Sequence, residues 1–218
     1  MNMPQTIKAI CSKCGKVHEV EARKRINVAD DPSLKDKVRD GSLFVWECPD
    51  CGTANLAVYD TLYHDPEEKV MIWLLPPGSV DESSVEALEQ QLRDHSDDLD
   101  GYILRRVEDV GSLIEKVNIF DAGLDDCVIE LCKYVTKMEL KNQGGGDGVL
   151  DLRMKFYKAD DAQGEMVFTY PDKGGIMGVR TGFNVYEDCA GILRRNPSVK
   201  VTSGFATIDP EWVSGIFG

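Results

Sequence analysis

Short runs rich in valine, isoleucine and other apolar residues occupy the first 78 residues, separated by charged and turn-forming residues, and indicate β-strands. The pattern predicts strands over 6–10, 17–28, 43–47, 56–63 and 70–75. The turn between the last two strands is expected at His64-Asp65-Pro66. One helix is predicted between the second and third strands, with Asp31 as its cap, Pro32 in its first turn and Gly41 at its end.

The central part of the chain changes to the spacing of amphipathic helices. A first helix is marked by the apolar positions Val107, Val110, Ile114 and Val117. A second helix is marked by Leu124, Val128, Leu131, Val135 and Met138. Only residues 121–123 separate them, so a helical hairpin is predicted. The acidic segment 79–100 before them is expected to combine a short exposed helix, with Val85, Leu88 and Leu92 at helical spacing, and a linker.

Beyond a glycine-rich break at 144–148, the period returns to two and predicts a β-hairpin with one buried face. Its inward positions are Leu150, Leu152, Met154 and Phe156, then Met166, Phe168 and Tyr170. The glycine-rich segment 174–178 lacks the Lys-Ser/Thr of a phosphate-binding loop. A helix over 184–195, with Asn184 and Glu187 at capping-box spacing, a strand over 199–208 and a short helix after Asp209 are expected to follow.

Composition restricts the classes of partner. The chain of 218 residues has 42% hydrophobic and 29% charged residues, as ordinary globular proteins do. Its formal net charge of −13 repels phosphate, which disfavours nucleic acid and anionic membranes as partners. There is no apolar run of roughly 18–20 residues, the length of a membrane span. Seven cysteines, an odd number, without a secretory segment predict reduced thiols and a cytoplasmic location.

Two cysteine motifs of the same form carry the strongest chemical signal. They are Cys11-Ser12-Lys13-Cys14-Gly15 and Cys48-Pro49-Asp50-Cys51-Gly52. Two residues between cysteines let a tight turn direct both sulfur atoms at one ion, and the following glycine tolerates the positive φ that closes the turn. Four thiolates fill the tetrahedral shell of Zn²⁺, whereas catalytic zinc keeps an open position. We therefore predict one structural zinc ion per chain, bound by Cys11, Cys14, Cys48 and Cys51.

Together these patterns predict an α+β fold. It comprises a zinc-ribbon-like antiparallel β region over 1–78, an acidic linker and helical hairpin over 79–143, and a C-terminal α+β segment over 149–218. The patterns leave open whether the three segments are separate domains or pack as one unit.

The sequence resembles the CpXC family, a bacterial and archaeal group named for its paired cysteine motifs. Besides the cysteines, the segments that carry the resemblance are 26–28, 31–35, 43–44, 63–66, 71–73, 119–121 and 124–126. The resemblance covers roughly residues 7–141. One departure is Ser12, where the family name implies proline, but this change removes no sulfur ligand. The resemblance implies the metal site and no particular reaction.

The leading functional hypothesis is a protein-interaction or scaffold module that contacts a partner protein or a second copy of itself. The filled metal shell and the lack of a catalytic constellation favour this hypothesis over an enzyme, and the question of enzymatic activity stays open. One alternative is an enzyme or small-ligand-binding protein with a site between ribbon and helices, near Tyr63, His64 and Asp65.

Two further alternatives remain open. The cysteine pairs could perform thiol redox chemistry, although such motifs usually precede a helix and these do not. The ribbon could bind nucleic acid through its basic residues, which are Lys8, Lys13, Lys16, Arg23, Lys24 and Arg25. His18, four residues after Cys14, is an alternative metal ligand.

Overall fold

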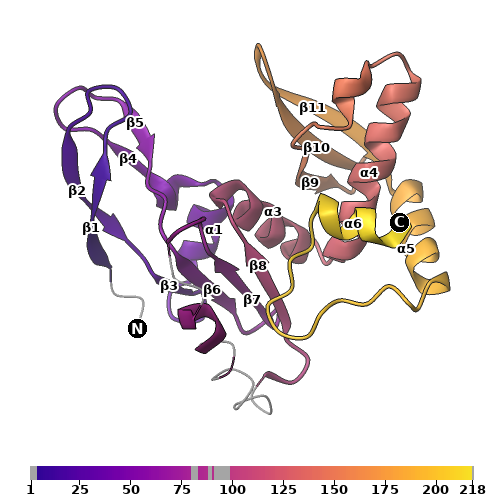
Figure 1. The fold of residues 1–218 in the computed structure, drawn as a ribbon, viewed down its shortest axis with the longest axis horizontal. Helices are drawn as coiled ribbons and strands as arrows, with labels where there is room; N and C mark the ends of the chain where they lie inside the picture. Colours follow the sequence, from indigo (N-terminus) through magenta and orange to yellow (C-terminus); the bar gives the residue numbers. More distant parts are fainter. Residues whose placement is uncertain (1–3, 80–82, 88–89, 91–98, 218) are drawn as a thin grey trace. The chain divides into compact units, whose positions relative to one another are not determined.

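The computed structural model describes residues 4–79, 83–87, 90 and 99–217 and confirms the mixed α+β fold (Figure 1). The chain divides into two compact units. The first unit contains Met1–Val117 and Ser203–Ala206, and the second contains Asn118–Thr202 and Thr207–Gly218. The boundary falls inside one helix, α3 (Val110–Asp121). The predicted division into three segments is not tested by this arrangement and stays a prediction.

Two short antiparallel hairpins form the start of the first unit. The first hairpin pairs β1 (Gln5–Ile10) with β2 (Val17–Ala22), and the second pairs β4 (Val45–Glu47) with β5 (Ala54–Leu56). A cysteine motif forms the loop of each hairpin. The predicted ribbon architecture is therefore confirmed.

A four-stranded sheet forms the rest of the β structure in the first unit. Its order is β3 (Arg25–Asn27), β6 (Thr61–Asp65), β7 (Val70–Leu74) and β8 (Ile103–Val107). The central pair β6–β7 is antiparallel, while β3 and β8 each add in parallel at an edge. All five residues of β7 are buried, as expected of a strand covered on both faces. One buried cluster contains Met71, Trp73, Leu75, Val85 and Phe205.

Several predicted boundaries in this unit are wrong. The single strand over 17–28 divides after Ala22 into β2 and β3, which join different sheets. The strand over 56–63 likewise breaks between Leu56 and Thr61. His64 and Asp65 belong to β6, and the turn lies at 66–69. Local composition cannot show where a continuous extended segment changes its pairing partner, because that is a tertiary choice.

The helix predicted between the hairpins forms, but Pro32 and not Asp31 is its N-cap, and its C-cap is Asp40, one residue before Gly41. It is α1 (Ser33–Arg39), and the Asp31 carboxylate accepts hydrogen bonds from the Ser33 amide at 3.2 Å and hydroxyl at 2.7 Å. Leu34 and Val38, one turn apart, are completely buried. After the helix, the Gly41 amide donates to the Val38 carbonyl.

The second unit combines helices with a three-stranded antiparallel sheet. Its strands are β9 (Lys155–Asp160), β10 (Glu165–Asp172) and β11 (Gly175–Gly182), with β10 in the centre. Its complete helices are α4 (Asp126–Asn142), α5 (Phe183–Arg195) and α6 (Pro210–Phe217). Figure 1 shows α4 beside this sheet, and the Thr136 hydroxyl lies 3.1 Å from that of Thr181 in β11. Phe156 and Phe168 are buried in edge-to-face contact.

Five further predictions outside the two cysteine hairpins need correction. Val107 ends β8 instead of lying in a helix, and β9 starts at Lys155, five residues after the predicted start. The glycine-rich segment 174–178 lies largely in β11. Gly182, not Asn184, occupies the N-cap of α5. The strand over 199–208 is reduced to one bridge between Arg105 and Ala206.

Other predictions for the helices are confirmed. Helices α3 and α4 form, with residues 122–125 between them. Residues 83–87 are helical and Val85 is buried, whereas Leu88 and Leu92 lie outside the described residues. Asp209 accepts a hydrogen bond from the Trp212 amide at the start of α6.

Asp65 links α1 to the four-stranded sheet. Its Oδ2 lies 3.2 Å from Lys35 Nζ of α1 and accepts a hydrogen bond of 3.3 Å from the Tyr63 hydroxyl. Its Oδ1 accepts a hydrogen bond from the Glu68 amide at 3.2 Å. The carboxylate side chain is only 4% exposed, so these contacts replace its hydration.

We expect Asp65→Ala to lower the free energy of unfolding by about 2–3 kcal/mol, because buried polar partners lose their acceptor. Asp36→Ala on the same helix is the control, since Asp36 is 83% exposed and its contact with Arg39 is 3.9 Å long. This control should change stability by less than about 0.5 kcal/mol. Urea unfolding measures both, and equal losses would contradict the structural role of Asp65.

Candidate metal centre

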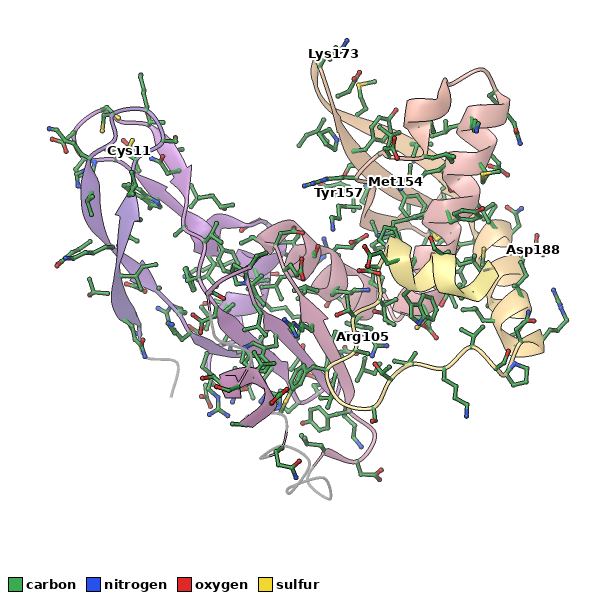
Figure 2. The ribbon with its side chains drawn as sticks, in the orientation of Figure 1. Cys11, Arg105, Met154, Tyr157, Lys173 and Asp188 are labelled. Carbon is green, nitrogen blue, oxygen red and sulfur yellow. The ribbon has the colours of Figure 1, made fainter. Side chains whose placement is uncertain are left out.

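The four motif cysteines meet between the loops of the two hairpins. Their Sγ atoms all lie within 4.8 Å of one another (Figure 2, sulfur in yellow near Cys11). The Cys11–Cys51 distance is 3.6 Å and the Cys14–Cys48 distance is 3.7 Å. Sulfur atoms about 2.3 Å from a central zinc ion would lie about 3.8 Å apart in a tetrahedron, whereas a disulfide needs about 2.05 Å. The donor set therefore fits a metal ion.

The two cysteine loops have the same backbone geometry. The Gly15 amide donates to the Cys11 carbonyl at 3.0 Å, and the Gly52 amide donates to the Cys48 carbonyl at 2.9 Å. Both glycines have positive φ, 69° and 65°, which side chains other than glycine rarely adopt. The two glycines therefore allow both loops to close in the same way.

Hydrogen bonds stabilise the thiolate form of two of the cysteines, which is the form that binds a cation. The Cys14 amide, acting against burial, lowers the pKa of Cys11 to about 6. The Thr53 hydroxyl lowers the pKa of Cys51. At Cys14, the Lys16 amide favours the thiolate, but desolvation and the neighbouring sulfur atoms outweigh it and raise the pKa to about 11. Four adjacent thiolates repel one another, so a divalent cation would favour the fully ionised set.

His18 lies beside the four thiols. Its Nε2 is 3.4 Å from Cys48 Sγ and 3.1 Å from Asp50 Oδ2, and its ring centroid is 5.7 Å from that of Trp46. His18, Cys48 and Asp50 form a second group of close potential ligands. His18, predicted as an alternative metal ligand, is by this geometry also a hydrogen-bonding neighbour of the site.

Asn55 is a site residue that the sequence analysis missed. Its Nδ2 lies 3.6 Å from Cys11 Sγ, and its Oδ1 accepts hydrogen bonds from the Ser12 amide and hydroxyl, both at 2.8 Å. The available signal was its spacing, because Asn55 follows Cys51 by the same four residues that separate His18 from Cys14.

Acidic side chains neutralise part of the basic set predicted on the ribbon. Three pairs join them: Lys16–Asp50 at 2.9 Å, Arg23–Glu21 at 3.1 Å and Lys24–Asp60 at 2.6 Å. This pairing weakens the local positive potential on which a phosphate backbone would depend.

The predicted cluster of Tyr63, His64 and Asp65 does not form one site. Successive side chains of β6 point to opposite faces of the sheet. The Tyr63 hydroxyl bonds to Asp65, whereas His64 Nε2 lies 3.2 Å from the hydroxyl of Tyr102. His64 and Asp65 are therefore not placed to act as an acid–base pair.

Within the described parts of the chain, no helix combines the length and the apolar character that crossing a membrane requires.

Comparison with known families supports the earlier resemblance. The family model described as CpXC protein matches residues 10–133, more than half of the chain, including all four motif cysteines. No curated protein and no solved structure shows significant similarity to the chain.

His64 should make stability depend on pH. Burial, assisted by the charge of Arg25, lowers the pKa of His64. Unfolding restores a pKa of about 6.5, so the unfolded chain binds the proton more tightly. The contribution of the neutral ring is therefore complete above about pH 6.5 and is lost as the pH falls through the lowered pKa.

We expect the free energy of unfolding to fall more between pH 7.5 and pH 5.5 in the unsubstituted protein than in His64→Gln. Urea unfolding at both pH values measures this difference. Because the metal centre is the same in both proteins, its own acid sensitivity cancels. Identical pH dependence of the two proteins would show that His64 is not the responsible group.

Proposed function

The chain belongs to the CpXC family, and we propose that it binds one structural zinc ion through Cys11, Cys14, Cys48 and Cys51. We further propose that it serves as a protein-interaction or scaffold module in the cytoplasm of a bacterial cell. The observation that carries the proposal is the convergence of four thiols with the spacing of a filled tetrahedral shell.

The donor set favours a structural metal. Four soft thiolates in a tetrahedron suit zinc better than magnesium or calcium, and they leave no position for a water nucleophile. Bound zinc would supply a crosslink between two hairpins that are too small to be stable separately. Zinc-finger peptides gain on the order of 10 kcal/mol from such a metal.

The arrangement of the thiols does not favour redox chemistry. Two close sulfur contacts, Cys11–Cys51 at 3.6 Å and Cys14–Cys48 at 3.7 Å, each join different motifs. A redox Cys-x-x-Cys pair would instead react within one motif, at the start of a helix that stabilises its thiolate. Here strands β2 and β5 follow the two motifs.

Exposed apolar side chains support a protein partner. Ile10 and Val17 face each other across the first hairpin, and Val45 and Leu56 face each other across the second. All four are more than half exposed, as is the nearby Val58. These apolar pairs lie next to the cysteine loops and could bind an apolar surface on a second copy of the chain or on another protein. The net charge of −13 and the neutralised basic residues support the exclusion of nucleic acid, and no membrane contact is proposed.

Elemental mass spectrometry on untagged protein should find close to one zinc per chain. Cys48→Ser should lose most of it, whereas Cys189→Ser, which alters a buried cysteine outside the site, should retain it. Chelation should unfold the two hairpins, because the crosslink is removed. Metal-free, folded protein with disulfides inside the motifs would contradict the proposal.

A photoreactive amino acid at Val45 should crosslink to protein in cells that produce the chain. The crosslinked product should be digested by protease and not by nuclease, because the apolar surface around Val45 favours a protein partner over a nucleic acid. Asp36, which is 83% exposed on α1, is the control position and should give little product. Products that nuclease digests would instead support the nucleic-acid alternative.

A further inference from the structure

The two halves of the metal centre are related by an internal repeat that extends beyond the cysteines. The Cys11 amide donates to the Lys16 carbonyl, and the Cys48 amide donates to the Thr53 carbonyl, five residues further on in each case. The fourth residue after the second cysteine is His18 in one half and Asn55 in the other. These two residues therefore occupy equivalent positions, although their side chains differ.

Asn55 reaches across to the other hairpin. Its Oδ1 accepts hydrogen bonds from Ser12, which fixes the orientation of the amide and makes Nδ2 the group that faces Cys11. One Nδ2 hydrogen can bond to the Thr53 carbonyl at 2.7 Å and the other to Cys11 Sγ at 3.6 Å. Both donors and the acceptor of this buried amide are thus engaged.

His18 makes the reciprocal contact. Its Nε2 lies between two acceptors, Cys48 Sγ at 3.4 Å and Asp50 Oδ2 at 3.1 Å. This contact is favourable only when Nε2 carries the hydrogen, because two acceptors and a bare ring nitrogen would repel one another. The ring is further held against Trp46. Each hairpin therefore sends one donor to the first cysteine of the other.

The sulfur atoms that receive these donors are the buried ones. Cys11 and Cys48 are each 1% exposed, so water could not replace the hydrogen bond that Asn55 or His18 donates to them. Cys14 and Cys51 are more exposed, and groups of their own loops lie against them: the Lys16 amide at Cys14, and the Thr53 hydroxyl 3.3 Å from Cys51 Sγ, which can donate once that sulfur is a thiolate. Cys11 also has the Cys14 amide of its own loop. His18 and Asn55 thus donate to the two thiolates that water reaches least.

We propose that His18 and Asn55 are a matched pair of positioning residues that control how long the two hairpins retain their metal. Each N–H group orients one buried thiolate and disperses its charge, and it also connects the two hairpins through the metal shell. This inference rests on the proposed zinc site and extends it to two residues that are not ligands.

Zinc transfer from the loaded, full-length protein to a chromophoric chelator tests the pair. His18→Phe keeps a ring against Trp46 but has no donor, and Asn55→Asp keeps the acceptor for Ser12 but places a carboxylate oxygen at the thiolate. Both should release zinc about ten-fold faster than the unsubstituted protein. His18→Gln restores a donor and should release zinc at close to the original rate.

Glu19→Gln and Ala54→Ser are matched controls. Glu19 follows His18 in β2, and Ala54 precedes Asn55 in β5. Both control side chains are exposed and point to the opposite face of their strand from the donor. Neither should change the release rate by more than about two-fold, far less than the shift expected when a hydrogen-bonding neighbour of a ligand is removed. Equal acceleration in controls and donor variants would overturn the inference, because it would reflect general weakening of the strands.

Cobalt(II) substitution supplies a second measurement. His18→Phe and Asn55→Asp should retain a tetrahedral four-thiolate spectrum with shifted thiolate-to-cobalt charge-transfer bands, because these bands report the charge on sulfur. An unsubstituted protein that binds neither zinc nor cobalt would refute the proposed metal site itself. Normal binding with unchanged release and spectra in both variants would refute only the role of His18 and Asn55.

Discussion

The convergence of four sulfur atoms is the constraint on which the ribbon depends. Its hairpins have strands of three to six residues, too short to be stable separately in water. Where they meet, His18 and Asn55 supply polar contacts to sulfur, and the ring of Trp46 packs against that of His18. Under the proposed function, a metal ion held by the four thiols would therefore supply most of the stabilisation between the hairpins.

The ribbon is joined to the four-stranded sheet by more than chain connection. The Ala57 amide donates to the Phe44 carbonyl, and the rings of Phe44 and Tyr59 pack with centroids 5.6 Å apart. The Thr61 hydroxyl bonds to the Arg23 carbonyl where β2 gives way to β3. These contacts fix the direction in which the chain leaves each hairpin.

Elements governed by local rules could be predicted from the sequence. Helix α1 follows from Asp31 and an apolar pair one turn apart, and β10 follows from strict alternation. Strands β8 and β11 were not predicted. In β8, Arg105 and Arg106 interrupt the apolar run, and in β11, three glycines lower the β-propensity of the segment. Pairing with a neighbouring strand compensates for such weak local preference, and that compensation is a tertiary effect.

The candidate ligands could be predicted from the sequence, since two residues between cysteines and a following glycine favour the closed turn that both loops adopt. The contacts of the other site residues could not be predicted, because they depend on how the two hairpins pack. The tertiary structure brought His18 and Asn55 to the cysteines of opposite hairpins, and it separated His64 from Asp65 although they are adjacent in sequence. The reason is geometric. The position of a residue in a strand determines the face from which its side chain projects, but tertiary packing determines which residues lie against that face.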